Sequence, residues 1–381
     1  MKGRKTMNLM PLEDVAEIIM GQSPPSSTYN SEGRGLPFFQ GKVDFGDLYP
    51  RNRVFCSAPQ KVAEKGDILI SVRAPVGPTN VSRDRSAIGR GLAALRCRSN
   101  LDPRWLLYFL RFYEPELAGI GKGSTFEAIS RSDLEDVRVP LPPLPEQQRI
   151  AAILARADHL RRLRRYALAL SEGYLQAVFV EMFGDQLQER HSRKQLGDLV
   201  AITGGGTPSR AISRYYEGTI PWLTSKDMRG DYIYDTQEHV TREAIDSSAT
   251  KLVPVGSLLV VVKSKVLMHR LPVAMTRVLL CHGQDIKSIQ CSSKIDPFFA
   301  LYVLRHSEPQ LLAQARGANT EGLTLPMLHE VPVPDVSLVR QRQFAQIIQR
   351  FDRVRAQQRE AARQAEQLFG ALLRRAFQGE V

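Results

Sequence analysis

The segment GKGST, residues 121–125, contains the glycine, lysine and hydroxyl residues of which phosphate-binding loops are made. Such a loop has the order G-x-x-x-x-G-K-[S/T], because backbone N–H groups surround the phosphates and the lysine and hydroxyl directly follow the last glycine. Here Lys122 is followed by Gly123, and the required order occurs nowhere else in the sequence. The sequence therefore predicts no nucleotide site, and the segment needs another explanation.

The other residues that could carry out chemistry lack the arrangements that catalysis needs. The sequence has no Asn/Asp-Pro-Pro-aromatic tetrapeptide typical of adenine methyltransferases and no Pro-Asp…Glu-x-Lys array typical of nucleases. Asp133, Glu135 and Asp136 adjoin a predicted short helix, where caps and a solvated face account for them better than an acid–base pair. The four cysteines include no C-x-x-C pair, which favours free thiols in a reducing cytoplasm over disulfides or zinc. We expect no catalytic group, metal or cofactor in this chain.

The basic composition indicates a polyanionic partner. The 381 residues carry a formal net charge of +12, so nucleic acid is the first candidate and an anionic membrane surface the second. The first ten residues have no apolar stretch typical of a signal peptide, and the longest apolar run, residues 258–262, is too short to span a bilayer. We therefore expect a cytoplasmic protein with more than one core.

The second half of the sequence repeats the first. The matching segments are LEDVAEIIMGQSP (12–24) with LGDLVAITGGGTP (196–208), LPFFQGKVDFGD (36–47) with IPWLTSKDMRGD (220–231), KGDILISVRAPVG (65–77) with VGSLLVVVKSKVL (255–267), and DPRWLLYFLR (102–111) with DPFFALYVLR (296–305). The offset grows from 184 (12 to 196) through 190 (65 to 255) to 194 (102 to 296). This growth predicts insertions in loops between shared core elements.

Each repeat begins with a mixed α/β part. The apolar runs DILISV and SLLVVV are typical of buried strands. Asp102-Pro103 and Asp296-Pro297 are typical of helix starts, with Asp as the cap and Pro in the first turn.

Each repeat ends in a long segment with the three-and-four spacing of a heptad seam. The seam positions are Ile150, Ile153, Ala157, Leu160, Arg164, Ala167, Ser171, Tyr174 and Val178 in the first repeat, and Phe344, Ile347, Phe351, Val354, Gln358, Ala361, Ala365, Leu368 and Leu372 in the second. About 38 residues of helix extend ~57 Å. An antiparallel pair of such helices would hold the two α/β parts at opposite ends; the alternative is that each helix packs only on its own domain.

The predicted fold class is α+β, with two repeated mixed α/β domains joined by two long helices in an antiparallel coiled coil of pseudo-twofold symmetry. The predicted divisions are residues 1–144, 145–185, 186–338 and 339–381.

The sequence resembles the specificity subunit of type I restriction-modification enzymes over essentially the whole chain. The motifs that carry the resemblance are IPWLTSKDM, VVVKSK, ISRSDLEDVRVPLPPLPEQQRIAAIL and LFGALLRRAF. The second junction, LTLPMLHEVPVPDVSLVRQRQF, lacks the PLPEQ segment and has Val339-Arg340-Gln341 instead. The two helices need not dock partners identically.

The resemblance implies two target recognition domains, each reading half of a bipartite DNA site, with a spacer set by the helices. It also implies docking of two modification subunits that carry S-adenosylmethionine and methylate adenine. A restriction subunit would add ATP-driven translocation and cleavage. In that arrangement this chain does no chemistry and holds no cofactor, since S-adenosylmethionine and ATP bind the partner subunits.

Candidate DNA-binding residues follow the predicted strands. Lys and Arg would contact phosphates, while Gln and Arg can make bidentate contacts to adenine and guanine. The candidates are Gln40, Lys42, Ser71, Arg73, Arg83, Arg85, Arg90 and Lys122 in the first half, and Thr224, Ser225, Lys226, Lys263, Ser264, Lys265, Arg270 and Arg316 in the second. Because the two sets differ, we expect an asymmetric bipartite target.

Three aromatic residues near the helix ends, Phe179, Phe183 and Phe377, are candidate anchors for a partner subunit. The basic run RRLRR, residues 161–165, fits contact with spacer phosphates, pairing with a partner's acidic residues, or a solvated face. Lys122 and Arg316 occupy matching positions in the repeat, so GKGST is interpreted as a loop at the end of the first recognition domain that contacts a DNA phosphate.

Two other functions remain open at this point. One is an enzyme, a methyltransferase or nuclease with unrecognised motifs. The other is a coiled-coil DNA scaffold without sequence preference.

Overall fold

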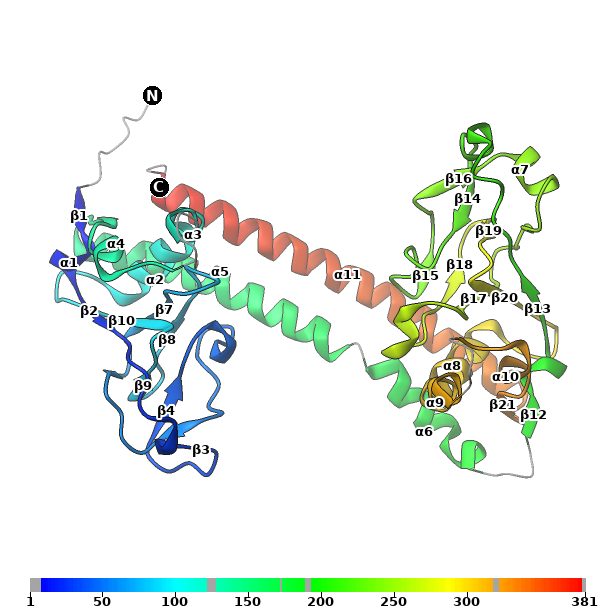
Figure 1. Cartoon of the computed structure of the whole chain (residues 1–381), viewed down its shortest axis with the longest axis horizontal. Helices are drawn as coiled ribbons and strands as arrows, with labels where there is room; N and C mark the ends of the chain where they lie inside the picture. The colour runs from blue at the N-terminus through cyan, green and yellow to red at the C-terminus, as the bar shows by residue number, and fades with distance from the viewer. Residues whose placement is uncertain (1–7, 122–127, 172, 189–192, 318–321, 379–381) are drawn as a thin grey trace. The chain divides into compact units, whose positions relative to one another are not determined.

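A computed structural model describes residues 8–121, 128–171, 173–188, 193–317 and 322–378. The chain forms two compact units: unit 1 contains residues 1–169 and 358–381, and unit 2 contains residues 170–357. Both units combine strands with helices (Figure 1), as the sequence predicts.

Unit 1 is formed mainly by the first repeat. Its elements are β1 Leu9–Pro11, α1 Leu12–Val15, β2 Ala16–Met20, β3 Tyr29–Asn30, β4 Leu36–Phe39, β5 Phe55–Cys56, β6 Val62–Ala63, β7 Ile68–Ser71, β8 Thr79–Val81, β9 Ser86–Ile88, β10 Leu92–Cys97, α2 Pro103–Phe112, α3 Glu114–Gly121, α4 Arg131–Glu135, β11 Arg138–Pro140 and α5 Leu144–Leu170. The strands form sheets of order β2-β10-β7-β8, β3-β5-β4-β9-β6 and β1-β11.

Unit 2 repeats this order with additions. Its elements are α6 Tyr174–Gln188, β12 Arg193–Gln195, β13 Val200–Gly204, β14 Ile220–Leu223, β15 Tyr232–Ile233, β16 Glu238–Val240, α7 Arg242–Asp246, β17 Leu258–Val261, β18 Val273–Thr276, β19 Cys281–His282, β20 Ile286–Cys291, α8 Pro297–His306, α9 Glu308–Gly317, α10 Leu325–His329 and β21 Pro332–Pro334. Helix α11, Leu338–Phe377, contributes its first half to unit 2 and its second half to unit 1.

The internal repeat is confirmed by strand pairing. Strands β2, β10 and β7 are adjacent in unit 1, and β13, β20 and β17 are adjacent in the same order in unit 2. The 3₁₀ helix η5, Lys265–Met268, occupies the loop between β17 and β18, where the second repeat is longer. This later insertion therefore lies in a loop, as the growing offset predicts, whereas the earlier one falls in a region of the second repeat that contains helix α7.

The Asp-Pro helix starts are also confirmed. Asp102 accepts hydrogen bonds from the backbone N–H groups of Arg104 (2.9 Å) and Trp105 (3.1 Å). Asp296 accepts the corresponding bonds from Phe298 (2.9 Å) and Phe299 (3.4 Å). These bonds satisfy N–H groups that have no partner within the helix.

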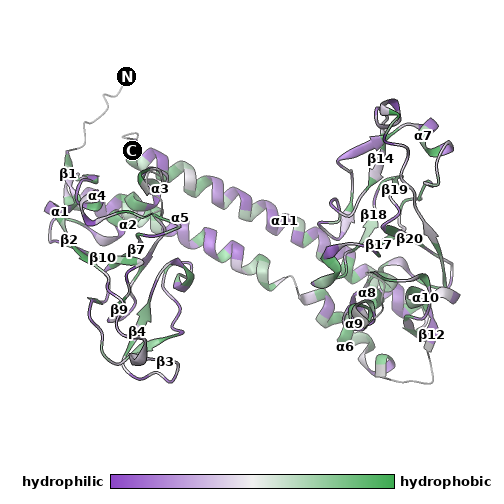
Figure 2. Cartoon of the chain, in the orientation of Figure 1, coloured by the Kyte–Doolittle hydropathy of each residue, from purple (hydrophilic) through white to green (hydrophobic). Residues whose placement is uncertain are grey.

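The first long helix differs from its prediction. An uninterrupted helix was expected over residues 145–185, but α5 ends at Leu170 and α6 begins at Tyr174. Gly173 lies between them, and glycine costs about 1 kcal/mol relative to alanine inside a helix. In the second repeat α11 continues for 40 residues. Hydrophobic and hydrophilic residues alternate along α11 (Figure 2).

The core of each unit contains a helix end from the other repeat. In unit 2, Phe179 and Phe183 of α6 are 0% exposed, and the ring of Phe183 lies 5.0 Å from that of Phe299 in α8. In unit 1, Phe377 of α11 packs with its ring 4.6 Å from that of Trp105 in α2. The prediction that these phenylalanines anchor a partner subunit is wrong for Phe179 and Phe183, because both rings are enclosed by their own unit. Phe377 is also partly buried against Trp105.

Arginines of the basic run in α5 form ion pairs within unit 1. The carboxylate of Asp158 is 0% exposed and pairs with Arg111 (3.1 Å), Arg161 (2.7 Å) and Arg162 (3.3 Å). Arg161 also donates to Glu366 of α11 at 2.9 Å. The run therefore contributes to the interior of unit 1 through Arg161 and Arg162, which none of the three sequence interpretations anticipated.

A buried glutamine connects each long helix to the α/β part of its unit. Gln147, 0% exposed, accepts from the Asp102 N–H at 2.9 Å and donates to the carbonyl of Pro142 at 2.8 Å. Gln341, 4% exposed, accepts from the Asp296 N–H at 2.9 Å and donates to the carbonyl of Val336 at 2.8 Å. The segment that leads into α11 lacks PLPEQ, but it retains the glutamine, as Gln341, together with its hydrogen bonds.

We predict that Gln147→Ala lowers the free energy of unfolding of unit 1 by about 2–3 kcal/mol, because it leaves buried backbone groups without partners. The two tryptophans, Trp105 and Trp222, lie in different units, so fluorescence during denaturation in a Trp222→Phe background reports unit 1. The adjacent, exposed Gln148→Ala is the matched control and should change stability by less than about 0.5 kcal/mol. Equal effects of both changes would contradict this role of Gln147.

Candidate nucleic-acid interface

Three loops meet in unit 1 at the C-terminal ends of β4, β7 and β9. Strands β4 and β9 are parallel, so their ends adjoin, and the N–H of Gly89 donates to the carbonyl of Phe39 at 2.8 Å. The N–H of Val72, after β7, donates to the carbonyl of Gly91 at 3.0 Å. We call residues 40–44, 72–74 and 89–91 loop junction 1.

A tight turn forms the middle of loop junction 1. The N–H of Leu92 donates to the carbonyl of Gly89 at 3.0 Å, which places Arg90 and Gly91 at the centre of the turn. A Cβ atom on Gly91 would lie 2.2 Å from the carbonyl oxygen of Gln40, closer than atoms can approach. Glycine at position 91 is therefore needed for the loops to meet.

The second repeat builds the same arrangement, loop junction 2, from residues 224–227, 262–265 and 283–285. The N–H of Gly283 donates to the carbonyl of Leu223 at 3.0 Å, and the N–H of Val262 donates to that of Asp285 at 2.9 Å. The N–H of Ile286 donates to the carbonyl of Gly283 at 3.3 Å, so Gln284 and Asp285 occupy the centre of this turn. Each bond has its counterpart in loop junction 1.

An aspartate closes the first loop of each junction. Asp44, 8% exposed, accepts from the N–H of Gln40 at 2.7 Å, and Asp227 accepts from the N–H of Thr224 at 2.9 Å. Neither aspartate was predicted from the sequence. The segments QGKVD and TSKD, which follow corresponding strands of the two repeats, each end in an aspartate, and this similarity could have indicated a shared role.

The exposed polar side chains of both junctions are cationic or amide-bearing, and loop junction 1 also exposes the apolar side chains of Val43 and Ala74. The polar ones are Gln40, Lys42, Arg73 and Arg90 in loop junction 1, and Lys226, Lys263, Lys265 and Gln284 in loop junction 2. Ser225 is half-buried. The structure thus brings together the predicted residues Gln40, Lys42, Arg73 and Arg90, which lie in three separate stretches of the sequence. Such a set can hold phosphate oxygens and donate to base edges.

Three predicted hydroxyl residues have structural partners instead. Ser71 is 1% exposed and donates to the carbonyl of Arg73 at 2.9 Å, so the prediction that it contacts DNA is wrong. Thr224 donates its hydroxyl to Asp227 at 2.8 Å. The hydroxyl of Ser264 caps η5 by accepting from Val266 N–H at 3.4 Å. Short hydroxyl side chains frequently bond the backbone of their own loop, which accounts for Ser71 and Ser264, whereas Thr224 bonds the aspartate that closes its loop.

Other predicted cations lie outside the junctions. Arg83 and Arg85 precede β9, whereas Arg90 follows it. Arg85 pairs with Glu64 at 3.3 Å, and Arg83 lines a polar cavity of about 410 Å³ with Asn52 and Asp84. Arg270 donates to the carbonyl of Met228 at 3.4 Å, beside the loop that follows β14.

Lys122 lies outside the described residues, and Arg316 is in α9 with a side chain that is not described. The described segment after each of these residues forms a backbone hydrogen bond to a loop junction. The N–H of Ile129 donates to the carbonyl of Val72 at 2.9 Å, and that of Leu323 donates to Val262 at 2.8 Å. Residues 122–125 of GKGST lie outside the described residues, so the interpretation of this segment as a loop stays a prediction.

Burial shifts the pKa values of three titratable groups on strands β10, β19 and β20. Burial lowers the pKa of His282, which precedes the turn of loop junction 2 and is 1% exposed, so its imidazole is neutral at pH 7. Burial also raises the pKa of the Cys97 and Cys291 thiols to about 12. Among the described residues no cluster of three or more His, Cys, Asp and Glu side chains could hold a metal ion.

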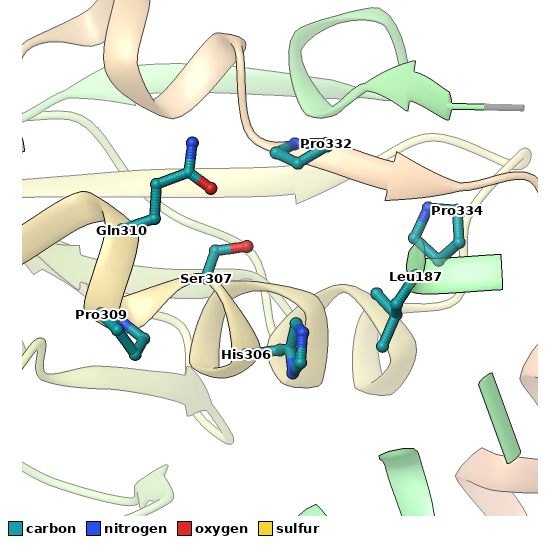
Figure 3. A pocket seen from close by; sticks show the side chains of 7 residues that line it. All are labelled: Leu187, His306, Ser307, Pro309, Gln310, Pro332 and Pro334. Atoms are coloured by element: carbon teal, nitrogen blue, oxygen red, sulfur yellow. The ribbon is translucent and has the colours of Figure 1, made fainter. Parts of the chain in front are cut away.

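A separate cavity of about 280 Å³ lies in unit 2 between the α8–α9 turn and β21 (Figure 3). His306, Ser307 and Gln310 line it together with prolines. The described residues that line it include no carboxylate, so the cavity has no acid–base pair.

Within the described part of the chain, no helix is both long enough and apolar enough to cross a membrane.

The family comparison agrees with the duplicated architecture. The model of the type I restriction modification DNA specificity domain matches residues 4–166 and 190–365. The chain belongs to this family.

Similar proteins include specificity subunits of type I restriction enzymes. The MjaX specificity subunit of Methanocaldococcus jannaschii is 46% identical over 154 residues, which cover 40% of this chain and 36% of that protein. The EcoR124I/EcoR124II specificity subunit of Escherichia coli is 26% identical over 235 residues, covering 59% of this chain and 57% of that protein. The chain thus spans less than two thirds of the length of these relatives.

The fold is similar to that of the S subunit of a type I restriction-modification system from M. genitalium. The crystal structure of that protein superposes with a TM-score of 0.65 at 16% identity, covering 99% of this chain and 98% of the other.

We predict that Gly91→Ala destabilises unit 1 by about 2–3 kcal/mol, because the new methyl group collides with the carbonyl oxygen of Gln40. Gly41→Ala, in the same junction, is the control: its backbone is extended and a Cβ there meets no atom within 4 Å. Thermal unfolding of both variants in the Trp222→Phe background, followed by Trp105 fluorescence, compares them. A Gly91→Ala protein as stable as Gly41→Ala would show that the loops can meet without this glycine.

Proposed function

We propose that this chain is the sequence-reading subunit of a type I restriction-modification complex, in which each unit binds half of a bipartite DNA site. The observation that supports this most is the duplicated loop junction, where one backbone framework presents two different sets of exposed side chains. Lys42, Arg73 and Arg90 supply positive charge in one unit, and Lys226, Lys263 and Lys265 supply it in the other. Family membership supports the same function.

The difference between the junctions supports an asymmetric target. Gln40 in loop junction 1 corresponds to Thr224 in loop junction 2, and Arg90 corresponds to Gln284. Guanidinium, amide and hydroxyl groups favour different base edges. Two units with the same frame and different side chains therefore select different half-sites.

We further propose that the long helices pair in an antiparallel coiled coil with pseudo-twofold symmetry and set the spacer between half-sites. In unit 1, the bond of Arg161 to Glu366 and the shared core of Ile150, Phe369 and Ala376 support pairing of α5 with α11. A 40-residue helix such as α11 is ~60 Å long.

The chemistry of the complex belongs to partner subunits in this proposal. Two modification subunits would bring S-adenosylmethionine, and restriction subunits would bring ATP. This chain contributes recognition alone, which its membership of the specificity-domain family supports.

We predict that the purified full-length chain, alone or with its modification subunits, enriches an asymmetric bipartite motif from randomised duplex DNA. The half-site centres should lie about one helical turn apart, ~10 base pairs, by analogy with dimeric readers. Binding should weaken steeply with salt because Lys and Arg displace counterions. A single continuous or palindromic motif would exclude the proposed arrangement. Enrichment of no motif would favour a scaffold without sequence preference, and methylation or cleavage by the chain alone would favour an enzyme.

We predict that one heptad inserted after Arg165 in α5, with a matching heptad after Arg359 in α11, lengthens the accepted spacer by about 3 base pairs. Seven helical residues add ~10 Å, and each base pair of DNA rises ~3.4 Å. Selection with libraries of graded spacer length measures the change. An insertion in α11 alone is the control and should impair folding, because it breaks the register of the pair; an unchanged spacer in the double insertion refutes the role of the helices.

A further inference from the structure

We infer that Arg90 and Gln284 are equivalent specificity-determining residues, one in each unit, and that Arg90 selects guanine in one half-site while Gln284 selects adenine in the other. This inference rests on the proposed function of DNA reading.

The two residues occupy the same position in the same turn. Arg90 follows Gly89, whose N–H donates to the strand end at Phe39 (2.8 Å), and Gln284 follows Gly283, whose N–H donates to the strand end at Leu223 (3.0 Å). The residues after them, Gly91 and Asp285, accept from Val72 (3.0 Å) and Val262 (2.9 Å). Two backbone bonds in each unit thus fix the side chain's point of attachment in matching surroundings.

Neither side chain has a structural role in its own unit. Arg90 and Gln284 are exposed, and in the described part of the chain neither side chain forms a hydrogen bond or an ion pair. By contrast, Arg96 in unit 1 is paired with Asp67 (2.8 Å), and Arg210 in unit 2 with Glu238 (2.7 Å). A free guanidinium and a free amide at the tips of two rigid turns are available to a ligand.

Cations flank both tips. Arg73 directly follows Val72, which bonds the turn of loop junction 1, and the N–H of Lys263 itself donates to Asp285 at 3.3 Å in loop junction 2. Gln284, Lys263 and Lys287 line one open cavity of about 570 Å³. Cationic side chains beside a hydrogen-bonding tip are the arrangement in which phosphates position the protein and the tip reads a base.

The hydrogen-bonding groups of Arg90 and Gln284 indicate which base each residue selects. A guanidinium donates two parallel hydrogen bonds to O6 and N7 of guanine, while an amide accepts from N6 and donates to N7 of adenine. Loss of such a bidentate pair reduces discrimination about tenfold or more. Arg90 was predicted from the sequence and Gln284 was not, although the offset of 194 aligns them.

The test is selection of randomised duplex DNA by the full-length chain carrying Arg90→Gln or Gln284→Arg. We expect Arg90→Gln to change one guanine to adenine in a single half-site, with about tenfold discrimination, and to leave the other half-site unchanged. Gln284→Arg should make the converse change in the other half-site. Arg90→Lys should keep the salt dependence of binding but lose the guanine preference, because an ammonium cannot make the bidentate contact.

Matched controls are Arg98→Gln and Gln290→Arg, at exposed positions of the same units outside the junctions, which should leave the motif unchanged. Unfolding temperatures equal to the wild type confirm that the variants fold. Folded Arg90→Gln and Gln284→Arg proteins that select the wild-type motif overturn the inference while leaving the proposed function intact, as does a variant that alters both half-sites together. A wild-type chain that selects no motif refutes the proposed function itself.

Discussion

Each unit depends on an aromatic ring supplied by the helix of the other repeat. Phe183 fills the core of unit 2 against Phe299, and Phe377 covers Trp105 in unit 1. Burying a phenylalanine side chain contributes about 1.5–3 kcal/mol, which is a large share of a typical domain's stability. Neither repeat can complete its core alone, so the compact units differ from the linear division of the sequence.

In each unit, residues that hold the backbone in place are distinct from the exposed side chains at the tips of the loops. Buried Gln147 and Gln341 join each long helix to its α/β part, and Gly91 allows the loops of junction 1 to meet. Changes at these positions would disturb the backbone. Changes at exposed tips such as Arg90 and Gln284 alter only what the surface presents, so one fold can carry many different binding surfaces.

The sequence predicts local features well because local spacing encodes them. The Asp-Pro caps at Asp102 and Asp296 are examples, and the internal repeat predicts which strands correspond. Burial of Phe179 and Phe183 was not predictable from spacing, since their partners in α8 and α11 lie more than a hundred residues away. Ser71 shows a second limit: an exposed and a buried serine look alike in a strand-end segment, and only the loop geometry reveals its bond to Arg73.

The contact between Phe377 and Trp105 also has a consequence for biosynthesis. Trp105 leaves the ribosome long before its covering ring exists, because the intervening residues take on the order of tens of seconds to translate at ~5–20 residues per second. During that interval the face of Trp105 that Phe377 covers lacks its covering ring. Completion of the core of unit 1 therefore waits until the second half of α11 has been synthesised, although most of that unit comes from the first repeat.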